Sequence, residues 1–110
     1  FVGGGRRGRL RVAAPAVLCR EMAGNILGME EADVSEDAAM DAIKELSNVL
    51  IGSLTARRLG VNVSCTLDTP TARKVDVAHV GALAACSGAL RFRVDEHLAV
   101  AVLDEREAGA

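Results

Sequence analysis

Two acidic residues and a carboxamide recur at helical spacing in this chain: Asp41, Glu45 and Asn48. At about 100° per residue, a helix would place these side chains, with Gly52 and Thr55, within roughly 40° of a common line. A carboxamide can hold a water molecule by hydrogen bonds, and a carboxylate can pair with a cation on another molecule. The stripe therefore has the residue types needed to position water and to fix a partner.

The opposite side of the same helix is apolar. It carries Ile43, Leu46, Leu50 and Leu54. This pattern predicts an amphipathic helix from about Glu36 to Leu59, with its apolar side packed and its polar stripe facing outward. Ser35 is a suitable N-cap and Gly60 a suitable residue to end the helix.

Two residues of the polar stripe weaken the helix that carries them. Asn costs about 0.6 kcal/mol relative to Ala inside a helix, and Gly costs about 1 kcal/mol. Gly52 also lacks the side chain that would keep another surface away. These choices favour a surface shaped for a partner. The alternative is that the stripe is simply a solvated helix face, which is common for polar and charged residues.

The spacing Asp-x3-Glu-x2-Asn, followed by x3-Gly, resembles the signature of the CheC/CheX family of chemotaxis phosphatases. Asp41, Glu45 and Asn48 occupy the three motif positions. The family pattern also has a Pro downstream, and here Pro70 follows Asn48 after 21 residues, which is close to the family spacing but not identical to it. The order of predicted elements is similar to that of such a domain from its second strand onward.

The resemblance implies a reaction and a set of roles. Members of the family dephosphorylate the aspartyl-phosphate of a CheY-type response regulator. By this likeness Asn48 would orient the attacking water and Glu45 would meet the active-site lysine of the regulator. Asp41 would shape the N-terminal side of the docking surface, and Gly52 would allow close approach. No metal or cofactor of its own is expected, because the Mg²⁺ in that reaction belongs to the regulator.

The resemblance also bears on assembly and on what the sequence spans. Family members with a single motif pair as dimers, so a homodimer is expected. The family's first helix and strand have no counterpart before Phe1, so the chain is read as an N-terminally trimmed fragment. The alternative function is a catalytically silent relative that uses the same face only to bind or to dimerise.

Length and composition indicate one domain over residues 1–110, since this length can bury one core. Phe1 and Phe92 are the only aromatic residues, so platforms on which nucleic-acid bases could stack are absent. Thirteen basic against fifteen acidic residues give a net charge of −2, which offers polyphosphates no basic excess. Nucleic acid is therefore not expected as a partner.

Cys19, Cys65 and Cys86 are odd in number and widely spaced, which argues against a disulfide framework or a zinc site. His79 and His97 lack acidic or cysteine neighbours at ligand spacing, and His97 is expected in a turn. The cysteine usage suits a reducing compartment, and a cytoplasmic protein is expected. No apolar run approaches the roughly 18 residues of a membrane span.

Gly3-x-Gly5-x-x-Gly8 matches a dinucleotide-binding fingerprint by letter. That fingerprint needs its glycines to open a helix, whose N-terminal amides then meet a pyrophosphate. Here Gly8 precedes an alternating pattern typical of a strand. Nucleotide binding is therefore not expected.

The remaining pattern predicts the other elements. They are the last residues of a strand at 1–2, a turn at 3–8, a strand at 9–13, a helix at 15–27 and a strand at 61–67. A closing hairpin of 90–94 and 98–103 follows, and then a frayed tail at 104–110. Residues 74–88 suit either a strand or a short helix. Glu21 and Asn25 are expected to be solvated. The fold class is α/β, a single-domain, antiparallel-rich sheet with two helices on one face.

Overall fold

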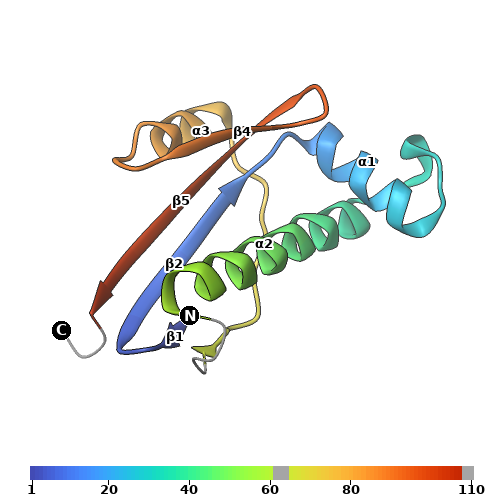
Figure 1. The fold of residues 1–110 in the computed structure, drawn as a ribbon. Coiled ribbons are helices and arrows are strands. Elements are labelled where there is room, and N and C mark those ends of the chain that lie inside the picture. The colour runs from blue at the N-terminus through green and yellow to red at the C-terminus, as the bar shows by residue number, and fades with distance from the viewer. Residues whose placement is uncertain (61–64, 108–110) are drawn as a thin grey trace.

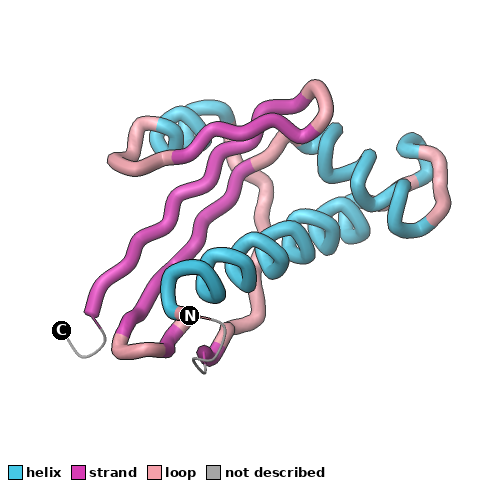
Figure 2. The backbone as a smooth tube through the Cα atoms, viewed as in Figure 1, coloured by secondary structure: helices cyan, strands magenta, loops and turns pink. Residues whose placement is uncertain are grey.

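The structure is a computed structural model, and it describes residues 1–60 and 65–107. In these residues three α-helices accompany a five-stranded antiparallel sheet of order β3-β1-β2-β5-β4 (Figure 1). The strands are β1 (Val2–Gly3), β2 (Arg6–Ala13), β3 (Cys65–Thr66), β4 (Leu90–Val94) and β5 (His97–Glu107). The helices are α1 (Ala16–Leu27), the short 3-10 helix η1 (Glu31–Asp33), α2 (Glu36–Leu59) and α3 (Val77–Ala84). Figure 2 shows β2 and β5 as the long central pair of the sheet. The predicted α/β class is confirmed.

A tight glycine turn joins β1 to β2. Gly4 and Gly5 both have positive φ, 58° and 73°, between the paired residues Gly3 and Arg6. Positive φ at both central residues is the requirement of a two-residue hairpin turn, which glycine meets without steric cost. The turn is therefore shorter than predicted, and β2 begins at Arg6 rather than at Arg9. Gly8 lies inside this strand and not in the turn that was predicted for residues 3–8.

The bounds of the two long helices agree with the prediction. Pro15 is the N-cap residue of α1, and Gly28 ends that helix in the left-handed conformation with φ 68°. The Ser35 hydroxyl oxygen accepts a hydrogen bond from the Ala38 amide at 3.1 Å and caps α2. Local capping chemistry is enough to fix these ends.

Small residues form the contact between α1 and α2. The buried cluster consists of Cys19, Ala23, Val34, Ala39 and Ala42. Alanines let two helices approach closely, so the larger apolar residues of α2 lie beside this contact and not inside it. The predicted apolar side of the helix, which includes Leu46 and Leu50, is only half-buried.

Polar contacts place α1 and α2 on one face of the sheet. His97 Nε2 lies 3.2 Å from a carboxylate oxygen of Glu21 on α1. Glu105, which shares the His97 face of β5 because strand residues alternate, forms an ion pair with Arg58 of α2. Two helices on one face are thus confirmed. His97 is the first residue of β5 and is not in a turn as predicted, and Glu21 is engaged instead of merely solvated.

The third helix, α3, covers the other face. Leu83 packs against Val100 and Val102, which alternate with the residues that face α1 and α2. Asp76 caps α3 by accepting a hydrogen bond from the His79 amide at 2.8 Å. The segment that the sequence left undecided is therefore helical at 77–84.

The expectation of a frayed tail was wrong for residues 104–107. These residues extend β5, where Asp104 pairs with Arg9 and Glu107 with Arg6. An eight-residue partner strand, β2, supplies the backbone hydrogen bonds that hold them. Residues 108–110 lie outside the described part of the chain, as do residues 61–64 of the predicted strand at 61–67. The described helices include none that is long and apolar enough to cross a membrane.

Glu105 ties the C-terminal end of α2 to the sheet. Its carboxylate accepts a hydrogen bond from Arg6 Nε at 3.0 Å and pairs with Arg58. Burial raises the pKa of the Glu105 carboxyl, but the contacts with Arg6 and Arg58 lower it by a larger amount. The resulting pKa lies below the ordinary value of 4.5. The two cationic contacts therefore favour the ionised carboxylate.

This arrangement predicts a pH-dependent contribution to stability. A lowered pKa stabilises the fold above the ordinary carboxyl pKa of 4.5, and the contribution is lost as pH falls through the folded-state pKa. Glu105→Gln should lower the free energy of unfolding by about 1 kcal/mol at neutral pH. Urea titrations should show this difference shrinking below pH 4.5. Glu107→Gln, at an exposed position, is the matched control, and an equal effect there would contradict the assignment.

Candidate active site

The residues of the motif lie on one exposed side of α2. The side chains of Asp41, Glu45 and Asn48 are exposed, and Gly52 is half-buried one turn further along. Within the described residues, neither Glu45 nor Asn48 forms a hydrogen bond or an ion pair with another side chain. Adjacent turns of a helix hold such residues about 5–6 Å apart between Cβ atoms. A carboxylate and a carboxamide are therefore presented together and unengaged.

Thr55 does not belong to this exposed stripe, although its spacing placed it there. It is buried, with 8 % of its surface exposed, and its hydroxyl donates to the Gly52 carbonyl at 3.1 Å. Thr55 and Arg58 are neighbours at i,i+3, and Arg58 reaches Glu105 on the sheet. The last turns of α2 approach the sheet, which encloses Thr55 and ends the exposed stripe before it.

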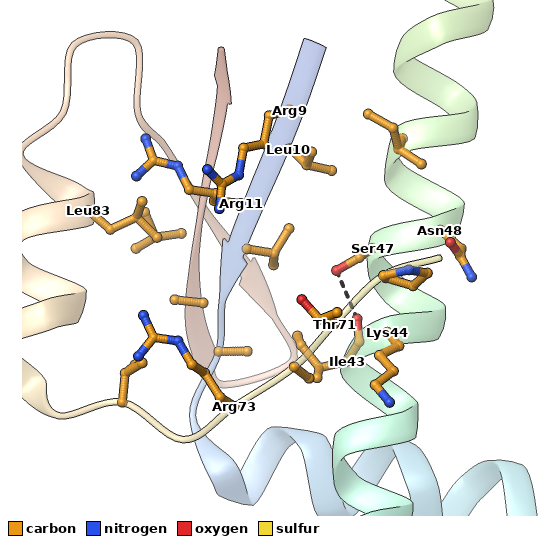
Figure 3. Close-up of a pocket in the computed structure, with 18 of the residues that line it drawn as sticks. Arg9, Leu10, Arg11, Ile43, Lys44, Ser47, Asn48, Thr71, Arg73 and Leu83 are labelled. Carbon is orange, nitrogen blue, oxygen red and sulfur yellow. Dashed lines mark hydrogen bonds between the residues drawn. The ribbon is translucent and has the colours of Figure 1, made fainter. Parts of the chain in front are cut away.

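Lys44 is a residue of this surface that the reading of the sequence missed. It precedes Asn48 by one helical turn, and Figure 3 shows both on α2. Its ammonium lies 3.7 Å from a carboxylate oxygen of Asp41. The same 100° rule that placed Asp41 and Asn48 together also places Lys44 within about 40° of Asn48, so the signal was present in the sequence.

Ser47, which also borders the site, is not a free nucleophile. Its hydroxyl donates a hydrogen bond to the Ile43 carbonyl at 2.9 Å, one turn back along α2 (Figure 3). Such back-bonding satisfies the hydroxyl within its own helix. The Cys19 thiol is buried, and burial raises its pKa, so its reactive thiolate form is disfavoured. Neither side chain is therefore set up as a nucleophile for covalent catalysis.

An open groove of about 1580 Å³ lies beside the motif. Asn48 lines this groove together with Pro70, the proline whose spacing from the motif resembled the family pattern. The loop before α3 also reaches α2 through an ion pair between Lys74 and Glu36. The chain thus returns to α2 after β3 and brings Pro70 and Asn48 to one groove. The groove leaves room for a protein surface to approach.

Gly52 has open space in front of it. A Cβ atom built on Gly52 would meet no other atom within 4 Å, apart from its own helix turn and chain neighbours. Gly52 therefore does not pack closely against a strand. Such packing would explain the glycine without any role in the approach of a partner. Because Gly52 has no side chain, no side-chain atoms project from the helix surface at this position.

We expect two different results from substitutions of Gly52. Gly52→Ala should raise the free energy of unfolding by about 1 kcal/mol, because alanine favours the helix and meets no clash. Gly52→Leu should leave the fold at least as stable but, if Gly52 admits a regulator as the resemblance implies, should impair dephosphorylation by blocking that approach. Gly81→Leu on α3, where a Cβ atom also meets nothing, is the matched control. Unchanged activity in Gly52→Leu would place the docking surface elsewhere.

The part of the chain that the structure describes holds no group of three or more His, Cys, Asp or Glu residues placed to bind a metal ion. The described cysteines are all free thiols: Cys19, Cys65 and Cys86.

The fold and the site define a small α/β domain that presents a Glu-x2-Asn pair on an exposed helix. The chain belongs to the CheX family, because the family model described as chemotaxis phosphatase CheX matches residues 1–82, about three quarters of the chain. The resemblance seen in the motif is thereby confirmed. The matched region includes α1, α2 and all four candidate site residues. No significant match to the chain is found among curated proteins or among solved structures.

Proposed function

We propose that this domain removes the phosphoryl group from the aspartyl-phosphate of a CheY-type response regulator. The observation that carries the proposal is the exposed, unengaged pair of Glu45 and Asn48 on α2, in a chain that belongs to a family of chemotaxis phosphatases. An exposed helix face suits a protein substrate better than a small molecule, which usually needs an enclosing pocket.

Asn48 has the chemistry to position the attacking water. A neutral carboxamide cannot act as a general base near neutral pH, but its oxygen and nitrogen can both hydrogen-bond one water molecule. Held in line with the phosphorus atom, that water attacks as the bond to the aspartyl oxygen breaks, and inorganic phosphate and the free aspartate are the products. The Mg²⁺ that neutralises the phosphoryl oxygens is supplied by the regulator.

Glu45 has the chemistry to fix the register of docking. Its carboxylate lies one turn from Asn48 and can pair with the active-site lysine of the regulator. Asp41 extends the same surface toward the N-terminus of α2 and holds Lys44 beside it. Gly52 leaves space for the regulator on the C-terminal side. These four residues form the proposed docking face.

The second candidate function is a catalytically silent domain that uses the same face to bind or to dimerise. The exposed side chains of Glu45 and Asn48, which have no side-chain partner among the described residues, support binding as well as catalysis. One assay separates the two: the protein is incubated with acyl-phosphorylated CheY-type regulators, and the loss of protein-bound phosphate is timed. Accelerated loss supports the phosphatase, and binding without acceleration supports the silent domain.

A cytoplasmic homodimer is part of the same proposal. Only Arg6 and Arg7 of β2 pair with β1, and Phe1 forms backbone hydrogen bonds with Gly8. The rest of this edge of β2 pairs with no other described strand. Unpaired edges favour association with another chain. Light scattering at tens of micromolar protein should return the mass of a dimer. A monomer mass alone would count against this assembly.

A further inference from the structure

The sheet face that α3 partly covers carries a cluster of arginines. Arg7, Arg9 and Arg11 alternate along β2, so their side chains lie on one face. Arg106 on β5 pairs directly with Arg7 and shares that face. Arg73 joins them from the loop before α3, because it lines the same groove. These five residues are called the arginine face below.

The charge of this face is poorly compensated. Arg11 pairs with Asp104 at 3.0 Å, but Arg7, Arg9, Arg73 and Arg106 form no ion pair with any described residue. Arg7 and Arg106 stand directly opposite each other, an arrangement that destabilises a sheet, whereas Arg9 stands opposite Asp104. The excess is local, because the whole chain has a net charge of −2. A sequence that keeps such a cluster against its own stability indicates an anionic partner.

The shape of the surroundings restricts that partner. Figure 3 shows Arg9 and Arg11 on β2 and Arg73 on the loop, with Leu83 of α3 at the side. All four line the groove of about 1580 Å³, which continues past the unpaired edge of β2 to residues of α2 on the other face of the sheet. A flat lipid surface does not enter such a recessed groove. The partner must be narrow enough to lie in it.

We propose that the arginine face binds an extended acidic segment of a partner protein. Successive side chains on one face of a strand are about 6.6–6.8 Å apart. Arg7, Arg9 and Arg11 therefore present positive charges at the repeat of an extended polypeptide with carboxylates at alternate positions. Guanidinium and carboxylate groups also match in geometry, since both can form two parallel hydrogen bonds. Binding of such a segment does not rest on the proposed phosphatase activity, although Asn48 lines the same groove as the arginine face.

Single-stranded nucleic acid is the other narrow polyanion, and the positions of the aromatic residues disfavour it. Phe92 pairs with Ala99, on the face of the sheet opposite the arginines. The ring of Phe1 occupies the space where a side chain of Gly8 would stand, which is on that opposite face too. The arginine face thus offers bases nothing on which to stack.

The test measures binding of defined probes to the whole chain at low salt. The probe is a fluorescent ten-residue peptide of alternating Glu and Thr, followed by anisotropy. We expect saturable binding that weakens as salt is added, because exposed charges are screened. A peptide of the same composition with its glutamates in one block should bind more weakly. A Lys-Thr peptide and a thymidine ten-mer should bind weakest.

Substitutions locate the site. Arg9→Gln and Arg73→Gln should each weaken binding of the Glu-Thr peptide by about fivefold, the effect of one exposed ion pair. Arg57→Gln, at an exposed position of α2 outside the groove, is the matched control and should leave binding unchanged. Circular dichroism confirms that each variant is folded. The proposal is overturned if the acidic peptide does not bind, if the thymidine ten-mer binds more tightly, if the block peptide binds equally well, or if Arg57→Gln weakens binding as much as Arg9→Gln.

Discussion

Asn48→Ala should lower kcat for dephosphorylation of a CheY-type regulator by about 10²-fold or more, if positioning of water supplies a few kcal/mol. An interaction realised mainly in the transition state appears in kcat, whereas binding shared by the ground state appears in KM. We therefore expect KM to change little. The measurement is the rate of phosphate loss at several concentrations of acyl-phosphorylated regulator.

Stability provides the internal check on this result. The Asn48 side chain is exposed and forms no hydrogen bond with a described residue, so its loss should not lower the melting temperature. Alanine is also the better helix former. Asn25→Ala, at an exposed position of α1, is the matched control and should retain full activity. If Asn48→Ala turns over phosphate at the wild-type rate, water positioning is not the role of this residue. If it unfolds the domain, the motif face is structural.

The motif helix could be predicted from the sequence because local chemistry defines it. Ser35 caps it, Gly60 follows it, and the residues between have a helical period. The same period placed Asp41, Glu45 and Asn48 on one exposed side. Each of these inferences depends on residues within one helix, where geometry is set by neighbours along the chain.

The errors of prediction concern contacts between residues far apart in the sequence. Residues 104–107 have a polar composition that suits a tail, yet they pair with β2 from the opposite end of the chain. Thr55 follows the polar stripe by angle but is enclosed where α2 meets the sheet. Segment 77–84 is helical because Leu83 docks on β5. No local propensity contains this information, since tertiary packing overrides it.

The arginine face, too, could be predicted from the sequence only in its local part. The alternation of Arg7, Arg9 and Arg11 is visible in the sequence and places them on one side of a strand. Their concentration is not visible, because Arg7 and Arg106 are 99 positions apart in the sequence and stand opposite each other only through the register of β2 with β5. Net charge alone argued against a polyphosphate or nucleic-acid partner. The structure shows that a chain with net charge −2 can still present a basic face.

Glu45→Lys should weaken binding to the regulator more than Glu45→Ala, and both should do so mainly through KM. The alanine variant loses the pairing with the lysine of the regulator, whereas the lysine variant faces that residue with a like charge. Exposed ion pairs contribute up to about 1 kcal/mol, so Glu45→Ala should raise KM by about fivefold. The effect of each variant should diminish at high salt.

The comparison with Asn48→Ala makes this prediction specific to a docking role. Glu45 is exposed, as is Glu96 in the turn between β4 and β5, so Glu96→Lys introduces the same charge reversal away from α2. That control should leave KM unchanged. If Glu45→Lys lowers kcat at saturating regulator and leaves KM unchanged, Glu45 acts on the reacting atoms and not on docking. If Glu45→Lys and Glu96→Lys raise KM equally, the effect comes from net charge, and the regulator does not dock on this face of α2.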